Sequence, residues 1–416
     1  MNLFFDNKII FINLDKKYDL IYSNETYSMI KVTKEISKII SEIINYKSGS
    51  DVGNSYDNKI LEILNKQKII FYTEEEFEKN RFIYKYKKMK DKVKISLAYI
   101  HLTQKCNLKC IYCYNRDNIN KKNELTTYQW YNILDKLMKI GISNFIFTGG
   151  EILLRKDLIN ILKYVKSKNN KFYIQVLTNG TLLNQYNNSF YECIDSLIVS
   201  LDTLNKDENA KYRLNSENYD IIGNLENIPH EYKNKIIVRS VITKENMQDI
   251  KELKAYVKNE LQYEHITSLC LPNNVNEIDN IPQLNNDFNE DTDIKMNNKV
   301  INCGGCSKEI AVDSNGDIYP CQNLINKEFL VTNILYQNWY DELLNSDITK
   351  EFMNLNVNSI EFCKDCNYRY LCGGGCRAIA YKVYGKLNCH LNFLCNQLKD
   401  DAIYRLRNQK FINYNK

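Results

Sequence analysis

Fourteen cysteines constrain this 416-residue chain more than any other feature, and most of them are crowded into short segments. Closely spaced thiols in a reducing compartment bind metal more often than they form disulfides. The chain has only four histidines, at His101, His230, His265 and His390. The ligands are therefore mainly thiolates, which favour zinc or iron–sulfur clusters. The surrounding sequence has to decide between these two kinds of site.

The overall composition excludes several other classes of protein. Hydrophobic residues make up 44% of the chain, charged residues 26%, and the net charge is only +5, so no nucleic-acid or membrane partner is expected. The apolar start at Leu3 is broken by Asp6, and no apolar run approaches the roughly 20 residues that span a bilayer. The sequence predicts a cytoplasmic protein.

Residues 1–88 lack cysteine and predict a small module of their own. Strand-like runs are followed by helical patterns, an order typical of a winged-helix-like fold. The predicted strands are residues 9–13, 20–23, 29–32 and 69–71, and the predicted helices are residues 36–44 and 60–64. The charged segment 74–92 is expected to be a linker.

Residues 93–271 alternate strands with helices, which predicts an α/β fold with parallel strands, either a partial (β/α)6 barrel or an open sheet. The predicted strands are residues 95–102, 144–147, 172–177, 196–201, 236–242 and 265–271. The acidic, asparagine-rich segment 272–299 is expected to be a linker, with a mobile loop over the active site as the alternative. Residues 300–416 are expected to form a separate cysteine-rich domain.

Cys106, Cys110 and Cys113 lie on a short loop directly after the first of these strands. Three thiolates can hold three irons of a [4Fe–4S] cube and leave the fourth iron without a protein ligand. An open metal position is typical of catalytic sites, whereas structural sites close theirs. A zinc site with a distant fourth ligand is the alternative.

This loop resembles the Cys-x3-Cys-x-aromatic-Cys signature of the radical S-adenosylmethionine (SAM) superfamily. The resemblance implies that the open iron binds the amino and carboxylate groups of SAM and that Tyr112 lies near the adenine. The run Gly149-Gly150-Glu151, after the second strand, is similar to the family's Gly-Gly-Glu motif and implies contact with the methionyl amino group. Ile152 stands where the family usually has proline.

Further strand ends carry polar residues in the family's order. These residues are Asn179, Ser200, Asp202 and Arg239. The resemblance implies that they contact the ribose and methionine of SAM, and Arg239 is a candidate for binding the SAM carboxylate. In this family a reduced cluster passes one electron to SAM. The products are methionine and a 5′-deoxyadenosyl radical, which takes a hydrogen atom from an unactivated carbon.

The remaining cysteine pattern is similar to the SPASM domain of peptide- and protein-modifying radical SAM enzymes, which implies two auxiliary [4Fe–4S] clusters. The first would use Cys303, Cys306, Cys321 and Cys376, and the second Cys363, Cys366, Cys372 and Cys395. Cys389 is then spare, although it could replace either partner. The close spacing of Cys303 and Cys306 leaves open a first cluster that uses only one of them and keeps an open iron. A zinc ribbon is the alternative for the whole set.

Two cysteines outside these sets, Cys193 and Cys270, fall in apolar contexts and are expected to be buried small hydrophobic residues.

The first 88 residues resemble the element with which ribosomal-peptide (RiPP) maturases capture a leader peptide as an added strand. Together the three parts imply a peptide maturase that installs a cross-link, with a cysteine thioether to carbon as the favoured product. Its partners would be a precursor peptide with its leader and an external electron donor such as a flavodoxin or ferredoxin. The alternatives are a sulfatase-maturase-like oxidase acting on a protein Cys or Ser, a carbon–carbon cross-linking maturase, and a zinc-binding interaction protein.

Overall fold

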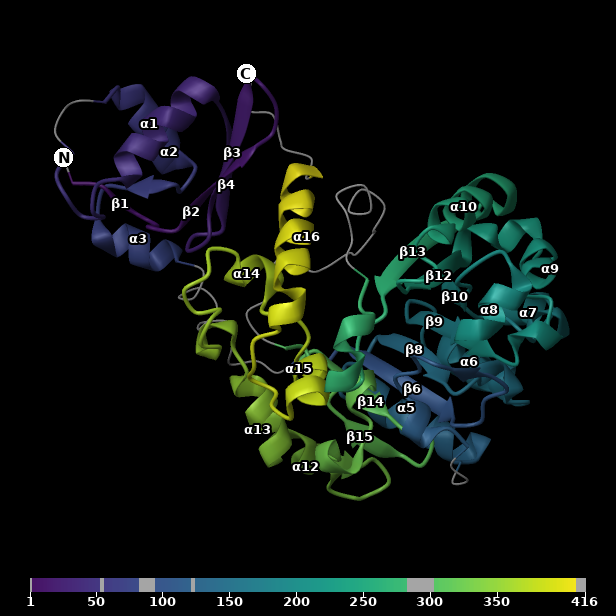
Figure 1. Cartoon of the computed structure of the whole chain (residues 1–416). Helices are drawn as coiled ribbons and strands as arrows, with labels where there is room; N and C mark the ends of the chain where they lie inside the picture. Colours follow the sequence, from purple (N-terminus) through teal and green to yellow (C-terminus); the bar gives the residue numbers. More distant parts are fainter. Residues whose placement is uncertain (1, 53–55, 82–93, 121–123, 283–302, 409–416) are drawn as a thin grey trace.

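The computed structural model describes residues 2–52, 56–81, 94–120, 124–282 and 303–408. Figure 1 shows an N-terminal module, a central sheet with helices, and a C-terminal part that lies between them.

The N-terminal module is built on an antiparallel three-stranded sheet in the order β2-β3-β4. Its elements are β1 (Phe4–Phe5), β2 (Ile9–Asn13), β3 (Tyr18–Ser23), β4 (Ser28–Thr33), α1 (Lys34–Ile44), α2 (Asn58–Lys66), β5 (Ile70–Phe71) and α3 (Glu74–Asn80). The predicted strands and helices are confirmed. Helix α3 occupies the start of the predicted linker, and residues 82–92 lie outside the described residues. The likeness to a winged-helix module stays a prediction.

Six parallel strands form one side of a nine-stranded sheet, in the order β13-β12-β10-β9-β8-β6 from the edge strand β13 inward. They are β6 (Leu97–Thr103), β8 (Asn144–Gly149), β9 (Tyr173–Thr178), β10 (Ser196–Ser200), β12 (Ile236–Ile242) and β13 (Glu264–Leu269). All six coincide with predicted strands, so the α/β fold class is confirmed.

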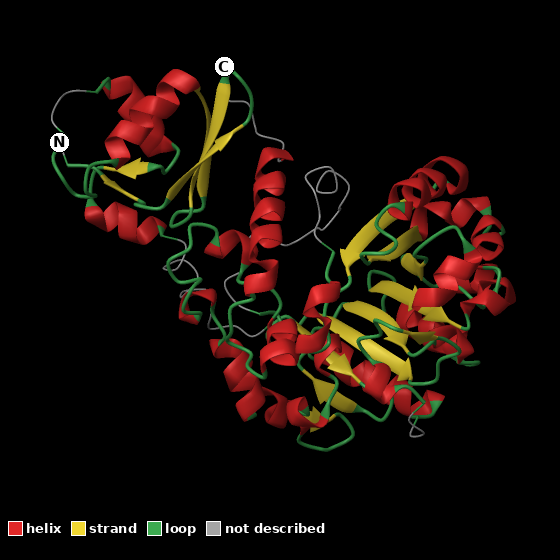
Figure 2. Cartoon of the chain, viewed as in Figure 1, coloured by secondary structure: helices red, strands yellow, loops and turns green. Residues whose placement is uncertain are grey.

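Helices cover the outer face of this sheet (Figure 2). They are α5 (Thr127–Lys139), α6 (Leu158–Lys168), α7 (Asn188–Glu192), α8 (Lys206–Tyr212), α9 (Ile221–Glu226) and α10 (Asp249–Tyr256). Helix α5 begins with a reciprocal capping box between Thr126 and Gln129. Trp130 of this helix and Phe147 of β8 are fully buried in the core between helices and sheet.

The cysteine-rich segment continues the central sheet, whereas the sequence predicted a separate domain. Strand β14 (Glu309–Val312) pairs parallel to β6, and β15 (Asp317–Tyr319) and β16 (Thr332–Asn333) follow antiparallel. The edge of β6 that would otherwise be unpaired therefore hydrogen-bonds to this segment. The remaining helices are α12 (Trp339–Asn345), α13 (Asp347–Asn354), α14 (Arg369–Cys372), α15 (Arg377–Tyr384) and α16 (Cys395–Asn408).

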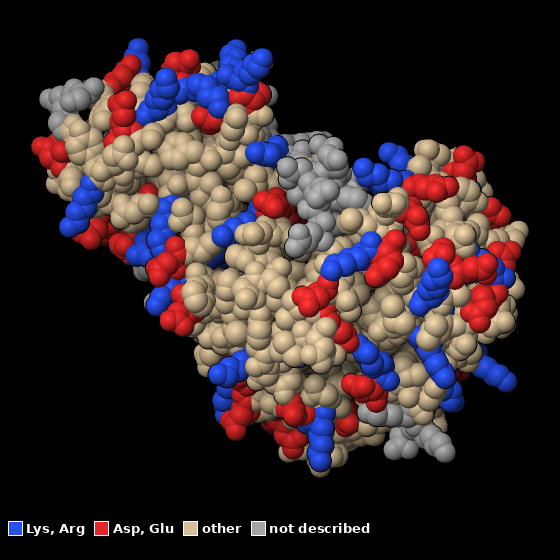
Figure 3. Space-filling model, in the orientation of Figure 1, with Lys and Arg blue, Asp and Glu red and all other residues tan. Residues whose placement is uncertain are grey.

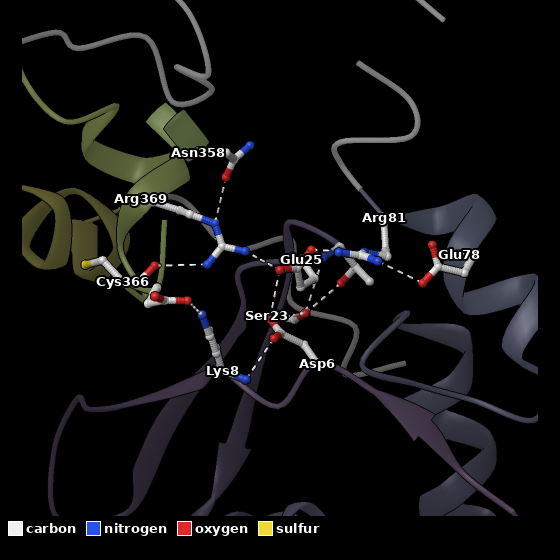
Figure 4. A network of polar contacts seen from close by, with 11 residues as sticks. Asp6, Lys8, Ser23, Glu25, Glu78, Arg81, Asn358, Cys366 and Arg369 are labelled. Carbon is white, nitrogen blue, oxygen red and sulfur yellow. Dashed lines mark hydrogen bonds and ion pairs between the residues drawn. The ribbon is translucent and has the colours of Figure 1, made fainter. Parts of the chain in front are cut away.

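The N-terminal module is docked on this C-terminal part through buried contacts. Leu20 and Tyr22 of β3 pack against Leu406 of α16. Beside them, Glu25 forms ion pairs with Arg369 and Arg81, and a guanidinium nitrogen of Arg369 donates to the Cys366 carbonyl (Figure 4). A buried ion pair with further hydrogen bonds fixes one docking geometry.

Charges of both signs alternate over the face of the molecule in Figure 3. Across the described residues, no helix combines the length and the apolarity needed to cross a bilayer.

His101 of β6 gives the fold a specific dependence on pH. Its side chain is fully buried, neither ring nitrogen has a hydrogen-bond partner among the described residues, and burial lowers its pKa to about 3. In the unfolded chain it takes up a proton near pH 6.5, so the stability that His101 contributes is present above that pH and is lost as the pH falls. From pH 7.5 to 5.5 this loss is about 1.4 kcal/mol.

We therefore expect His101→Phe to flatten the fall in unfolding free energy between these two pH values, measured by denaturant titration. His230 is exposed, so His230→Phe serves as the control and should keep the slope of the unsubstituted chain. Equal slopes in the His101 variant and the unsubstituted chain would contradict the expectation.

Candidate functional site

A cavity of about 1060 Å³ lies at the carboxyl ends of the parallel strands, where the C-terminal part faces the sheet. In parallel α/β folds this edge is where ligands bind. Cys106, Cys110 and Cys113 line this cavity, and so do Cys303, Cys372 and Cys376 of the C-terminal part. Cysteine sets almost 200 residues apart in the sequence therefore share one cavity.

The three-cysteine loop is held in place by a small ladder. Strand β7 (Lys109–Cys110) pairs antiparallel with β11 (Arg213–Leu214). Burial raises the pKa of Cys106 to about 12 and also raises the pKa values of Cys110 and Cys113. Thiols in such a place ionise only when a metal takes the proton's position.

Gly149 and Gly150 bring the end of β8 against the backbone of this loop. A Cβ atom at Gly150 would lie 2.2 Å from the Lys105 carbonyl oxygen, and one at Gly149 would lie 2.1 Å from the Thr103 oxygen. Gly149 also has a φ of 147°. Both positions therefore require glycine. Both residues line the cavity, as the predicted cofactor contact needs.

Glu151 and Asp202 were predicted as cofactor contacts, but neither is among the residues that line the cavity. The Glu151 carboxylate accepts hydrogen bonds from the Thr178 hydroxyl and the Asn179 and Leu153 backbone N–H groups. Burial raises the pKa of Glu151. The side chain ties the ends of β8 and β9 together beneath the cavity.

The Asp202 carboxylate is fully buried, and neighbouring groups bind both of its oxygens. It pairs with Arg213, and it accepts hydrogen bonds from the Tyr112 hydroxyl and the Val241 N–H. The Arg213 guanidinium lies over the Tyr112 ring, with 5.5 Å between its central carbon and the ring centroid. Asp202 thus orients Tyr112 and Arg213, both of which line the cavity.

The other predicted contacts do face the cavity. Asn179, Ser200 and Arg239 line it from three neighbouring strands. The Asn179 side chain also donates to the Asn107 side-chain oxygen at 2.9 Å, which connects β9 to the cysteine loop. Arg239 has long contacts of 3.3 and 3.4 Å to the Ser268 hydroxyl, so its charge remains available to a ligand.

Two cationic residues that line the cavity, Arg213 and Lys382, were not predicted from the sequence. Arg213 is a single arginine after a short helix. Lys382, on α15, lines the cavity and donates to the Asn273 side chain at 2.9 Å. Arg213 is recognisable only because the tertiary structure places it beside Cys110, and Lys382 only because it interacts with cysteines of two sets, Cys113 and Cys376.

Four of the predicted auxiliary cysteines surround a second cavity of about 490 Å³; they are Cys363, Cys366, Cys372 and Cys395. Their thiols also act on one another electrostatically, and burial raises the pKa of Cys363 to about 11. Cys389 does not line this cavity, and its thiol points to the His390 carbonyl. The structure therefore brings Cys395, not Cys389, to this set.

Cys303, Cys321 and Cys376 form the third group, and their thiols act on one another electrostatically. Cys306 is fully buried, and burial raises its pKa to about 11 without any other thiol acting on it. It adopts a φ of 56° in the tight loop that leads to β14, and it belongs to the core around Phe352. Cys321 and the partly buried Cys303 belong to the same core cluster, so Cys306 lies near this group although no other thiol acts on it electrostatically.

Across the described residues, no three Cys, His, Asp or Glu side chains converge tightly enough to hold a single metal ion. A [4Fe–4S] cube has a different requirement, because each of its thiolates binds a different iron. Apart from Cys321, which lines neither cavity but interacts electrostatically with Cys303 and Cys376, all members of the three thiol groups line a cavity. The three groups fit clusters of this size.

The two remaining cysteines differ in their surroundings. Cys193 is buried in the core of the sheet, as predicted, and its thiol donates to the Ser189 carbonyl at 3.0 Å. The prediction for Cys270 was wrong, because it is partly exposed and lines the large cavity. Strand β13 ends at Leu269, so the next residue lies where the sheet opens into the cavity.

Comparison with known proteins agrees with this geometry. Residues 100–257 match the radical SAM superfamily, and residues 303–367 match the SPASM iron–sulfur cluster-binding domain. The chain is 26% identical over 322 residues to a cysteine-type anaerobic sulfatase-maturating enzyme of Clostridium novyi, which covers 65% of this chain and 85% of the relative. It is 24% identical over 300 residues to the antilisterial bacteriocin subtilosin biosynthesis protein AlbA of Bacillus subtilis, which covers 67% of this chain and 66% of AlbA.

Among solved structures, SuiB of Streptococcus suis bound to S-adenosylmethionine matches with a TM-score of 0.57 and 17% identity. The match covers 94% of this chain and 99% of SuiB. SuiB bound to the precursor peptide SuiA matches with a TM-score of 0.55 and 18% identity over the same shares of the two chains. At these identities the likeness is one of fold.

The central sheet is thus a radical SAM domain and the cysteine-rich segment that extends it a SPASM domain, and the chain is an enzyme of the radical SAM superfamily.

Proposed function

We propose that this enzyme is a peptide maturase that installs a cross-link, a cysteine thioether to carbon, in a ribosomally made precursor peptide. The observation that carries the proposal is the shared cavity. The three-cysteine loop and three cysteines of the C-terminal part, Cys303, Cys372 and Cys376, line the same space. A peptide segment lying there would be in reach of both sites.

In this proposal Cys106, Cys110 and Cys113 hold the catalytic [4Fe–4S] cluster. The cluster and SAM together supply hydrogen-atom abstraction from an unactivated carbon. Gly149 and Gly150 allow the backbone to approach SAM closely. Asn179, Ser200, Arg239 and Tyr112 provide the polar and aromatic contacts around it.

The auxiliary sites supply the argument for a thioether. We assign Cys363, Cys366, Cys372 and Cys395 to a fully ligated cluster, and Cys303, Cys321 and Cys376 to a second one. We leave Cys306 out of the second cluster because no other thiol acts on it electrostatically, so one iron of that cluster has no cysteine ligand and can take a substrate thiol. Forming the C–S bond removes one hydrogen atom from carbon and one proton from sulfur, and it leaves one electron for the protein to accept. An external flavodoxin or ferredoxin is the proposed electron donor.

The N-terminal module is the proposed site for the leader of the precursor peptide. The fold match to SuiB, whose structure includes the precursor peptide SuiA, extends over nearly the whole chain and so takes in this module. AlbA, a relative over two thirds of the chain, acts in bacteriocin biosynthesis. In the described residues β4 has no second strand partner, and Val32 is its only buried residue. An extended peptide can add to such an edge.

A second candidate is a sulfatase-maturase-like oxidase that acts on a protein cysteine or serine. The match to the Clostridium novyi enzyme, over 85% of that enzyme's length, favours it. The match involves 65% of this chain, so it leaves about a third of the chain without a counterpart. The two candidates differ in whether the N-terminal module binds the substrate.

The ligand assignment can be tested by counting iron and sulfide after anaerobic reconstitution. Three [4Fe–4S] clusters correspond to about twelve irons per chain. We expect Cys303→Ala and Cys395→Ala to lower the iron content, because each removes a ligand.

The neighbours Cys306 and Cys389 provide matched controls. Cys306→Ala and Cys389→Ala should retain the full iron content, since neither thiol belongs to a set. Loss of iron in either control would refute the assignment, and stoichiometric zinc in a colourless protein would refute the clusters altogether.

Leader binding can be tested by hydrogen–deuterium exchange on the full chain, with a precursor peptide encoded beside its gene as the probe. We expect the peptide to slow exchange in β4 because its edge gains hydrogen bonds. Strand β2, at the opposite edge of the sheet, serves as the internal control. Unchanged exchange throughout residues 9–33 despite turnover of the peptide would favour the oxidase.

A further inference from the structure

Arg377 has surroundings that differ from those of the other buried arginines. Three arginine side chains are buried in the described part of the chain, each 4–5% exposed; they are Arg213, Arg369 and Arg377. Arg213 is paired with Asp202, and Arg369 is paired with Glu25, as Figure 4 shows for the latter. Within the described residues, no carboxylate pairs with Arg377.

The hydrogen bonds of Arg377 all go to neutral backbone carbonyls. Its guanidinium nitrogens donate to the oxygens of Gly374, Gly375, Leu387 and Cys389. These bonds satisfy the donors and shape the glycine loop between Cys372 and Cys376. They do not neutralise the charge, and a buried cation without a counter-ion is costly.

The position of Arg377 in its helix adds to this cost. Arg377 is the first residue of α15, directly after the N-cap residue Cys376, and the first turn of that helix contains no acidic residue. The N-terminus of a helix carries a partial positive charge and favours anions. Two positive charges thus meet at a buried point, so an anion is needed there.

The groups that can supply this anion are the cysteines of both auxiliary sets. Arg377 lines the large cavity together with Cys303 and Cys376, and with Cys372 of the other set. The thiols that act on it electrostatically are Cys376, Cys303, Cys363 and Cys372. Two of these belong to each set. An iron–sulfur cluster held by thiolates is an anion that becomes more negative on reduction.

We propose that Arg377 is the counter-charge shared by the two auxiliary clusters and that its charge raises the reduction potentials of both. This role rests on the ligand sets of the proposed function. A fixed positive charge stabilises the reduced cluster more than the oxidised one, since the reduced cluster carries one more electron. Arg377 is a positioning residue in this sense, because it acts on the substrate only through the clusters.

The test is a redox titration of the full chain, reduced stepwise with dithionite and followed by electron paramagnetic resonance. Cys106, Cys110 and Cys113 are replaced by alanine in every sample so that only the auxiliary clusters, about eight irons per chain, are observed. We expect Arg377→Gln to retain this iron and to shift both auxiliary potentials to more negative values. Arg377→Lys keeps the charge, and its shift should be clearly smaller.

A second control tests whether the loss of any buried arginine, without a change in net charge, alters the potentials. The double variant Glu25→Gln with Arg369→Gln removes a buried guanidinium together with its carboxylate, so the net charge is unchanged. Because Arg369 also donates to the Cys366 carbonyl, small shifts in the potentials of this variant are expected, but they should be clearly smaller than those of Arg377→Gln. Unchanged potentials in an iron-loaded Arg377→Gln variant, or equal shifts in the Gln and Lys variants, would overturn the proposal.

If Arg377→Gln loses its iron, Arg377→Lys distinguishes a role of the positive charge from a role of the guanidinium hydrogen bonds. Parent-like iron and potentials in Arg377→Lys would support the role of the charge. Loss of iron in both variants would mean that the guanidinium is needed for its hydrogen bonds, which overturns the proposal. A parent chain without auxiliary iron would overturn the ligand sets and the role of Arg377 together, whereas unchanged potentials overturn the role alone.

Discussion

The parallel pairing of β14 with β6 is the contact on which the rest of the structure depends. Strand β6 leads directly into the loop with Cys106, and β14 lies between Cys306 and Cys321. Main-chain hydrogen bonds between these two strands set the register, so they fix where one cysteine set lies relative to the other. Without this pairing the radical SAM domain and the SPASM domain would be two separate units, and no common cavity would exist between them.

Buried charge is the second organising constraint around the site. Asp202 with Arg213 and Glu25 with Arg369 are pairs in which each partner satisfies the other. Such pairs add little net stability, but they penalise every arrangement in which one partner is left alone. The first pair orients the side chains that face the cavity, and the second orients the N-terminal module. Arg377 is buried without a carboxylate partner among the described residues, and for this reason we proposed the auxiliary clusters as its counter-charge.

In the part of the chain that the structure describes, the N-terminal module packs against α16 and against the loop that carries Cys363 and Cys366. Tyr27 packs with Val357 and Cys363, and Arg369 joins Glu25 to the Cys366 carbonyl. A leader bound to this module would therefore be anchored at the SPASM end of the cavity.

The sequence by itself determined the elements and the chemistry. The alternation of strands and helices, the loop of Cys106, Cys110 and Cys113, and the glycines after β8 follow from local patterns, because backbone periodicity and ligand spacing act over a few residues. Only the tertiary structure decided which of several equivalent side chains face a site. Cys306 turns into the core through its left-handed backbone, Cys270 opens into the cavity, and Asp202 is taken up by Arg213. These outcomes depend on packing and charge partners distant in the sequence, which no local pattern encodes.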